Sequence, residues 1–282
     1  MNKDTPVASR IVFLGAGNMA EALISGLLRH QTARPDQLRV TDIAPQRCAH
    51  FQATYGVSSE STNSEAVRNA QIVVLAVKPQ GVPALLAEIR EAVTAEHLLI
   101  SIAAGISSTT IEAALGGGRR VVRSMPNTPA LIGQGMTALC AGSCATDADM
   151  DVAERLLRSA GRVVRVREEQ MDGVTAVSGS GPAYLFYLME AMQTAAEELG
   201  LDGRLAHELV SATLAGAAAL ALDADQSPAE LRRRVTSKGG TTAAALAVLD
   251  ENDVAAHWGA AIRAAHQRSR ELSAAAAVNH AG

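Results

Sequence analysis

Short continuous runs of hydrophobic residues alternate with stretches of helical spacing over roughly the first 160 positions. Five of the runs are predicted strands, at residues 11–14, 38–41, 72–77, 98–102 and 121–123. Helices are predicted between them, at residues 19–30, 45–55, 83–91 and 107–115. Because apolar residues fall on both faces of each strand, helices should cover the sheet on both sides. This alternation predicts βαβ units and a doubly wound parallel sheet.

The pattern changes after about residue 167. Two last strand-like runs, 137–141 and 162–166, flank a helix expected to begin near Asp147, with Asp147 or Asp149 as its cap, and they should extend the same sheet. Beyond them we predict helices alone, at residues 183–199, 204–221, 229–235, 241–249 and 254–275. We therefore expect an α/β domain over residues 1–167 and an all-helical domain over residues 168–282.

The composition argues against nucleic-acid and membrane partners and suggests association with further copies of the chain. The chain has 282 residues, of which 48% are hydrophobic and 2% aromatic, and its net charge of −4 argues against a nucleic-acid or anionic-membrane surface. The one dense basic cluster, 232–234, is typical of a solvated helix face. The Ala-rich helices after residue 183 have faces too apolar for solvent, which predicts a homodimer or a larger homo-oligomer.

The sequence also bears on location. Met1–Arg10 lacks the apolar core of a signal peptide. The most apolar later stretch, 209–222, is shorter than the ~20 residues of a membrane span and is expected to be a buried helix. Cys48, Cys140 and Cys144 are too few and too scattered for a disulfide framework. We expect a cytoplasmic protein without a membrane partner and, given histidines on polar stretches, without a metal.

The strongest chemical motif is a glycine-rich loop, Gly15-Ala16-Gly17-Asn18-Met19-Ala20, which follows the first strand and opens the first helix. Gly15 permits the tight turn, and Gly17 lets the backbone approach a pyrophosphate. The helix start adds N–H donors and a partial positive charge. In this setting the loop predicts a Rossmann-like dinucleotide-binding domain.

The choice between NADH and NADPH is open. Asp42 ends the second predicted strand, where a carboxylate can accept hydrogen bonds from the adenine ribose of NADH and would repel a 2′-phosphate. Arg47 lies close enough in sequence to offset that repulsion. The alternative is that Asp42 caps the following helix and selects nothing.

Four further segments support a ligand site. Ala76–Gln80 and Ser101–Gly105 end the third and fourth strands, where open α/β sheets bind ligands, and they offer a strand-breaking Pro79 and small residues. Val177–Tyr184 and Thr236–Ala243 are Gly- and Ser/Thr-rich and each precedes a helix, which predicts anion-binding breaks. Together they indicate a carboxylate substrate opposite a nicotinamide.

Taken in order, these motifs resemble one family, the pyrroline-5-carboxylate reductases of proline synthesis. The resemblance runs from Ile11 to about Ala275. It includes GAGNMA, AVKP, MPNTPA and SGSGPAY, and a signature within residues 228–250 that contains Thr236, Ser237, Gly239, Gly240 and Thr242. It implies a dinucleotide domain, a C-terminal helical substrate and dimerisation domain, and NADPH or NADH as hydride donor to a cyclic imino acid.

The resemblance also implies site residues. The cofactor would contact Leu14, Gly15, Ala16, Gly17, Asn18, Met19, Ala76, Val77, Lys78, Pro79, Ile102, Ala103 and Ala104, with Asn63 near the adenosine. The substrate would contact Ser237, Gly239, Gly240, Thr241 and Thr242. Thr242, the expected catalytic residue, would hydrogen-bond the imine nitrogen. Arg234 departs from the Asn that some members present, so that contact is not carried over.

Two rival functions remain. A β-hydroxyacid dehydrogenase also joins a glycine loop to a helical domain, but it needs a catalytic lysine on a helix of the second domain. Lys238, the only lysine after Lys78, is expected in a loop. A non-catalytic dinucleotide-sensing protein would keep the glycine loop but would not need the segments at 177–184 and 236–243.

Overall fold

A computed structural model describes residues 9–278, so the prediction for the N-terminal segment lies mostly outside the described residues. The chain forms two compact units, which we name the sheet unit (Met1–Ser180 with Ala265–Gly282) and the helical unit (Gly181–Ala264). The contact-based division falls after Ser180, whereas the sequence pattern changes after about residue 167. Residues 168–180 pack with the sheet: Met171, for example, is fully buried in a cluster with Ala138 and Cys140.

The sheet has eight strands in the order β3-β2-β1-β4-β5-β6-β7-β8. Their bounds are β1 Ile11–Leu14, β2 Leu38–Thr41, β3 Ser58–Ser59, β4 Ile72–Leu75, β5 Leu98–Ser101, β6 Arg120–Met125, β7 Gly135–Ala141 and β8 Gly161–Arg165. All neighbours are parallel except β6 and β7. The sheet is therefore mostly, not wholly, parallel, because the short connection at 126–134 cannot make the crossover that a parallel pair requires.

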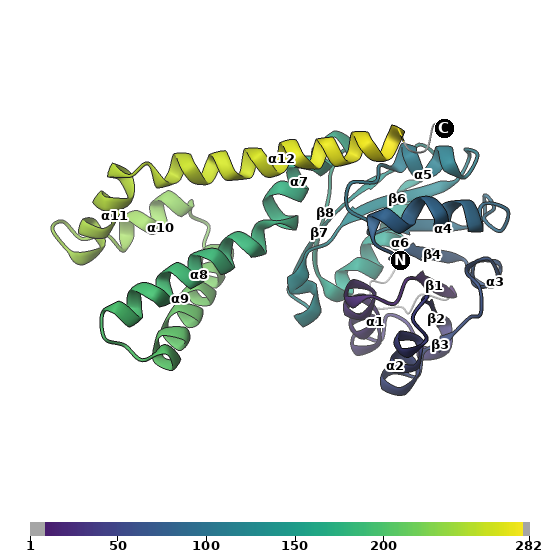
Figure 1. Ribbon diagram of the computed structural model, residues 1–282, viewed down its shortest axis with the longest axis horizontal. Helices are drawn as coiled ribbons and strands as arrows, with labels where there is room; N and C mark the ends of the chain where they lie inside the picture. Colours follow the sequence, from purple (N-terminus) through teal and green to yellow (C-terminus); the bar gives the residue numbers. More distant parts are fainter. Residues whose placement is uncertain (1–8, 279–282) are drawn as a thin grey trace. The chain divides into compact units, whose positions relative to one another are not determined.

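Helices cover both faces of this sheet (Figure 1). They are α1 Asn18–Arg29, α2 Pro45–Tyr55, α3 Asn63–Arg68, α4 Val82–Ile89, α5 Ser108–Ala114 and α6 Asp147–Leu157. Ile11 and Phe13 of β1 join a core with α1, α2 and α6, while Val12 and Leu14 join a second core with α3, α4 and α5. Alternate strand residues thus enter opposite cores, which explains why the strand runs are continuously hydrophobic.

Helix α6 is capped differently from the prediction. The side chain of Thr146, not of an aspartate, accepts the N–H of Asp149, and Asp149 reciprocates through the N–H of Thr146 at 2.9 Å. The pair forms a capping box, which satisfies two backbone donors at once.

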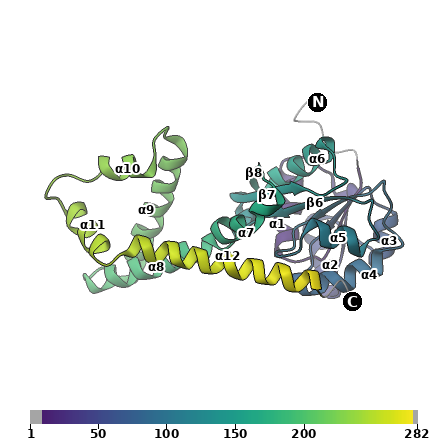
Figure 2. The same cartoon turned by 90° about the horizontal axis from the view of Figure 1, so that it is seen from above.

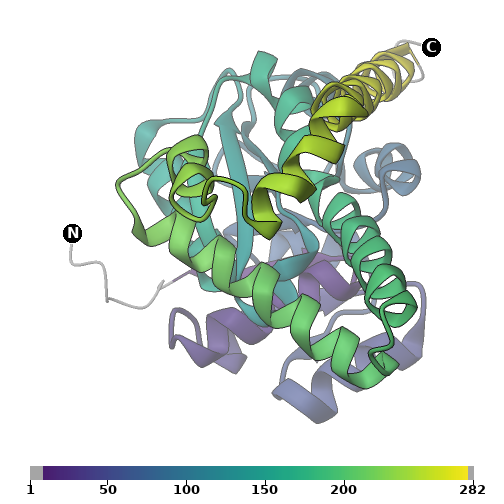
Figure 3. The same ribbon diagram turned by 90° about the vertical axis from the view of Figure 1, so that its left-hand side faces the viewer.

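The helical unit contains α8 Gly181–Glu198, α9 Gly203–Asp223, α10 Pro228–Arg234 and α11 Thr241–Glu251. Helix α12, Val254–Val278, follows α11 (Figure 2). From Ala265 onward it belongs to the sheet unit. Helices α8 and α9 pack side by side as a hairpin (Figure 3). No strand occurs after β8 among the described residues, as the sequence predicted.

Helix α9 corrects the expectation of a buried helix at 209–222. Ala206 and Val210 are buried, but Leu209 and Leu220 are about half exposed and Leu222 is more so. By length and composition alone α9 is apolar enough to cross a membrane, with a mean hydropathy of 1.5 and only 11% of its most apolar window buried. The single chain therefore leaves much of an apolar helix uncovered.

Candidate active site

The glycine loop between β1 and α1 is built for a close ligand. Gly15 has φ +105°, and a Cβ there would lie 2.8 Å from the backbone of Ala76 and Val77, so only glycine fits. Gly17 differs: a Cβ there would meet nothing within 4 Å. Gly17 is the N-cap of α1 and no side chain caps the helix. The open space and the uncapped amides fit a pyrophosphate group.

The peptide of Ala16 is held from both sides by residues that follow β2. Asp42 Oδ2 accepts the Ala16 N–H at 2.7 Å, and Asp42 Oδ1 accepts the Ala44 N–H at 2.8 Å. Arg47 Nε donates to the Ala16 carbonyl at 2.7 Å. Asp42 is not the N-cap of α2, because that position is Ala44. Both residues singled out for cofactor choice thus also fix the shape of the glycine loop.

Arg47 is neutralised by a carboxylate of α1. Glu21 accepts hydrogen bonds from Arg47 Nη2 at 2.7 Å and Tyr55 Oη at 3.0 Å, and His50 Nε2 lies 2.7 Å from it. Burial would raise the pKa of Glu21, but these partners lower it from 4.5 to about 2. Glu21 therefore stays ionised at neutral pH and keeps the guanidinium beside the loop.

The remaining cofactor candidates lie at the same edge of the sheet. The Ala76 N–H donates to Leu14 at 2.8 Å, and the Ile102 N–H donates to Leu75 at 3.1 Å. Thr41 Oγ1, at the end of β2, donates to Asn63 Oδ1 at 2.5 Å. The structure thus brings together the predicted residues of 14–19, 42, 63, 76–79 and 102–104, at the carboxyl ends of β1, β2, β4 and β5. Open α/β sheets bind their ligands at this edge.

One candidate for a ligand contact was not predicted from the sequence. It is Ile43, whose side chain is fully exposed directly after Asp42. An apolar residue in the turn after the second strand was the available signal. Ordinary surface residues also look like this in sequence, so the pattern alone did not single it out.

The segment Val177–Tyr184 is not the open helix start that was expected. Helix α7 (Met171–Val174) continues through a π-helix at Thr175–Gly179 towards α8. The Ser180 N–H donates to the Thr175 carbonyl at 2.8 Å, so this amide is already hydrogen-bonded within the helical segment. Asn127 Nδ2 donates to the Ser178 carbonyl at 3.0 Å and ties the π-helix to the loop after β6. Short π-helical turns are frequent at functional sites, but the Ser180 amide is not free to bind an anion.

The second predicted anion loop does form, within the helical unit. Gly240 is the N-cap of α11 and has no side-chain cap, so the first amides of α11 are open. Gly239 has φ +73°, and a Cβ on Gly240 would lie 2.4 Å from Ser237 Oγ. Thr242 is half-buried in the first turn of the helix. The predicted substrate residues 237 and 239–242 therefore share one tight turn before an uncapped helix.

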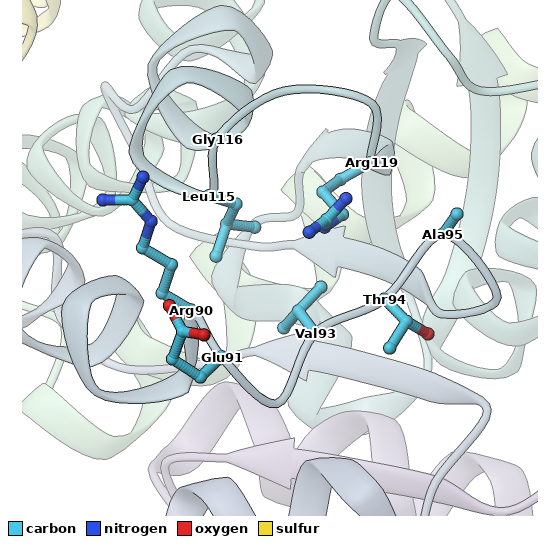
Figure 4. Close-up of a pocket in the computed structure, with 8 residues that line it drawn as sticks. All are labelled: Arg90, Glu91, Val93, Thr94, Ala95, Leu115, Gly116 and Arg119. Carbon is cyan, nitrogen blue, oxygen red and sulfur yellow. The ribbon is translucent and has the colours of Figure 1, made fainter.

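A hollow of about 500 Å³ lies elsewhere, where β5 and β6 begin (Figure 4). Arg90 and Arg119 lie on opposite sides of Leu115 in this view. Arg90 is the C-cap of α4, where a cation interacts favourably with the helix dipole. This edge is opposite to the glycine loop, so the hollow is not the cofactor site. Among residues 9–278, no group of three or more His, Cys, Asp or Glu could hold a metal ion.

Two family models match the chain. Residues 10–105 match the model described as NADP oxidoreductase, coenzyme F420-dependent. Residues 168–272 match the model described as pyrroline-5-carboxylate reductase dimerisation, which begins where the helical domain was predicted to begin. The two matches cover the cofactor loop and the loop before α11 respectively.

Individual relatives agree over nearly the whole length. The pyrroline-5-carboxylate reductase of Pseudomonas aeruginosa is 46% identical over 94% of this chain and 97% of its own. That of Haemophilus influenzae is 42% identical over 93% and 97%. The solved structure of a pyrroline-5-carboxylate reductase from Coxiella burnetii has a TM-score of 0.89 at 39% identity, covering 95% of this chain and 99% of that one.

A second solved structure bears on the cofactor. The Plasmodium falciparum pyrroline carboxylate reductase with NADP bound has a TM-score of 0.86 at 28% identity, covering 95% of this chain and all of that one. The open glycine loop, the turn before α11 and the length of these matches lead to one conclusion. The chain belongs to the pyrroline-5-carboxylate reductase family, as its motifs predicted.

Proposed function

We propose that this chain reduces L-1-pyrroline-5-carboxylate to L-proline, the last step of proline biosynthesis, with NADPH or NADH as hydride donor. The observation that carries the proposal is the 46% identity to a pyrroline-5-carboxylate reductase over 94% of the chain. The test is oxidation of each reduced cofactor by pyrroline-5-carboxylate and, separately, by β-hydroxyacid dehydrogenase substrates such as small keto acids. Turnover with the keto acid alone would replace this function with that of the rival dehydrogenases.

We assign the cofactor to the carboxyl edge of the sheet. The uncapped amides at 17–19 would bind the pyrophosphate, and the small residues 102–104 would lie against the nicotinamide ribose. Residues 76–79 would line the path between them, with Asp42 and Asn63 near the adenosine. Ile43 offers an exposed apolar surface for the adenine ring. When bound, the reduced nicotinamide supplies the hydride.

We assign the substrate to the turn before α11. Open helix amides and the Ser237 hydroxyl would bind its carboxylate, and the Thr242 hydroxyl would hydrogen-bond the ring nitrogen. A protonated imine is already an electrophile, so the reaction needs orientation and charge stabilisation more than a strong acid. This fits a site that offers hydroxyls and amides instead of a paired acid and base.

Cofactor preference provides a test of Asp42. Asp42→Ser removes a negative charge next to the proposed adenine ribose. Relief of its repulsion on a 2′-phosphate, about 1–2 kcal/mol, should raise the NADPH/NADH ratio of kcat/KM on the order of tenfold. Both cofactors should lose some affinity, because Ala16 loses its hydrogen-bond acceptor. The ratio is therefore the informative quantity.

Asp36 supplies the matched control for that measurement. It is an exposed aspartate that precedes β2, whereas Asp42 follows it. Asp36→Ser should leave the cofactor ratio unchanged. An unchanged ratio in Asp42→Ser as well would mean that Asp42 shapes the loop without selecting the cofactor.

We propose that the chain is a homodimer or a larger homo-oligomer, because the apolar surface of α9 is uncovered in one copy. Light scattering across dilution should give at least twice the mass of one chain. Leu209→Glu should shift the distribution towards monomers, since a charge would then have to be buried at the interface. A monodisperse monomer of the parent protein at micromolar concentration would contradict the proposal.

We place the enzyme in the cytoplasm, where its nicotinamide cofactor is available. Cys48, Cys140 and Cys144 are all free thiols, which is consistent with a reducing compartment. The domain roles proposed here follow the predicted division into a dinucleotide domain at 1–167 and a substrate and dimerisation domain at 168–282.

A further inference from the structure

Glu168 joins three separate elements of the sheet unit. Its Oε1 accepts a hydrogen bond from Arg123 Nη1 of β6. Its Oε2 accepts one from Ser108 Oγ of α5 at 2.8 Å and one from Cys140 Sγ of β7 at 3.2 Å. The three donors are distant from Glu168 in sequence, so only the tertiary fold brings them together.

The partners of Glu168 are more buried than Glu168 itself. Arg123 is 3% exposed and Ser108 is 2% exposed, whereas the Glu168 side chain is 27% exposed. Arg123 Nη2 is also buried and finds no hydrogen-bond partner in the described part of the chain. A buried guanidinium needs a counter-charge. Glu168 supplies it.

The charge states of Glu168 and its neighbours determine which groups donate hydrogen bonds and which accept them. Burial would raise the pKa of Glu168, but Arg123 and the hydrogen bonds from Ser108 and Cys140 lower it below its usual value. Burial and the nearby Glu168 carboxylate raise the pKa of Cys140 to about 12. At neutral pH a carboxylate that only accepts is therefore surrounded by groups that donate.

These contacts lie on either side of the loop at 102–107 along the chain. Arg123 lies opposite Ser101, the last residue of β5, in the sheet register, and the neighbouring Ser124 Oγ donates to the Ser101 carbonyl at 2.9 Å. Ser108 is the first residue of α5, directly after the loop. Through Arg123 and Ser108, Glu168 thus acts on the strand before the loop and on the helix after it.

We propose that Glu168 is a positioning residue, which fixes the loop between β5 and α5 in the shape that receives the nicotinamide ribose. The proposal rests on the proposed placement of the nicotinamide end of the cofactor at residues 102–104. Glu168 touches neither substrate nor cofactor, and it acts through Ser108 and Arg123. It should therefore affect the nicotinamide end of the cofactor and leave the adenosine end unchanged.

The test compares two ligands in Glu168→Gln. Displacement of the loop should weaken binding of the reduced dinucleotide about tenfold and lower kcat/KM for pyrroline-5-carboxylate about tenfold to a hundredfold. ADP lacks both the nicotinamide and its ribose and should bind within about twofold of the parent. Ser108→Ala removes one hydrogen bond and keeps the ion pair, so it should show the same pattern with a smaller loss. It also keeps the test possible if Glu168→Gln fails to fold.

Glu112 provides the matched control. It is a buried carboxylate on α5 that accepts the N–H of Ser143 at 2.7 Å and the Ser143 hydroxyl at 2.8 Å. Ser143 follows β7, which runs antiparallel, so this contact lies at the edge of the sheet away from the cofactor. Glu112→Gln should lower the Tm but leave both ligand affinities unchanged.

Three results would overturn the proposal. The first is full dinucleotide affinity and activity in folded Glu168→Gln. The second is an equal loss of ADP and dinucleotide binding, which indicates general loosening of the fold. The third is the same selective loss in Glu112→Gln. A parent protein inactive on pyrroline-5-carboxylate would instead refute the proposed function, and the binding comparison would still decide the role of Glu168.

Discussion

Gly17→Val should abolish measurable binding of NADPH and NADH while the protein stays folded. The backbone at Gly17 has φ −79° and ψ −179°, an extended conformation that valine adopts readily. A Cβ there would contact no atom of the chain within 4 Å, so the side chain would occupy the space proposed for the pyrophosphate. Loss of about two charge-assisted hydrogen bonds, each worth about 1.5–3 kcal/mol, weakens binding on the order of a hundredfold or more.

Gly15→Ala gives the informative contrast. Its Cβ would lie 2.8 Å from the backbone of Ala76 and Val77, and φ +105° is strained for alanine. This variant should therefore lose stability as well as cofactor binding, whereas Gly17→Val should keep the Tm of the parent. Titration of cofactor fluorescence and thermal unfolding separate the two effects. Tight cofactor binding by folded Gly17→Val would show that the cofactor loop has been wrongly placed.

Thr242→Ala should lower kcat/KM for pyrroline-5-carboxylate on the order of tenfold to a hundredfold. A hydrogen bond to a charged group is worth about 1.5–3 kcal/mol, and each 1.36 kcal/mol is tenfold in rate. Thr242 lies in the first turn of α11, next to the uncapped amides proposed to bind the substrate carboxylate. Removing its hydroxyl leaves those amides and the cofactor residues in place, so cofactor affinity should hardly change.

Two further variants distinguish the effect of losing the Thr242 hydroxyl from the effect of changing the shape of the turn. Thr242→Ser keeps the hydroxyl and should recover most of the activity. Thr236, just before the same turn, is the matched control. Its Oγ1 already donates a hydrogen bond to the Arg232 carbonyl at 2.7 Å. Thr236→Ala should keep most of the activity. Equal impairment of the Ala and Ser variants at 242 would assign the effect to the methyl group, and full activity in both would remove Thr242 from the site.

The elements of the sheet unit could be predicted closely from local pattern. The run 11–14 and the helix 45–55 have the predicted bounds, and β4 ends two residues before the predicted limit. Pro45 at the first helical position and Gly56 in a left-handed conformation after Tyr55 mark α2 at both ends. Such signals act over a few residues, so sequence alone identifies them. The two-residue β3 carries no pattern and was missed.

The two loops of the candidate site could be predicted from the sequence in the same way. Gly15 and Gly17 follow a strand and open a helix, and their roles depend on local backbone geometry that the sequence already implies. The turn at 237–242 has the same property. In contrast, the two hydrogen bonds of the Ala16 backbone, one to Asp42 and one from Arg47, join residues far apart in the chain. Sequence placed both residues near the cofactor but did not indicate that they also hold the loop.

By itself, the sequence determined the alternation of the main strands and helices, the position of the glycine-rich loop and the family, because periodicity and glycines act locally and the motifs are specific. Only the tertiary structure decided the antiparallel direction of β7, the π-helix at Thr175–Gly179, the exposure of α9 and the convergence of three donors on Glu168. Each of these depends on which surfaces and hydrogen-bonding groups meet across the fold. Ser180 shows the difference: its motif resembles a helix start, yet its N–H is bonded to Thr175, because backbone donors inside a folded chain take the partners that packing provides.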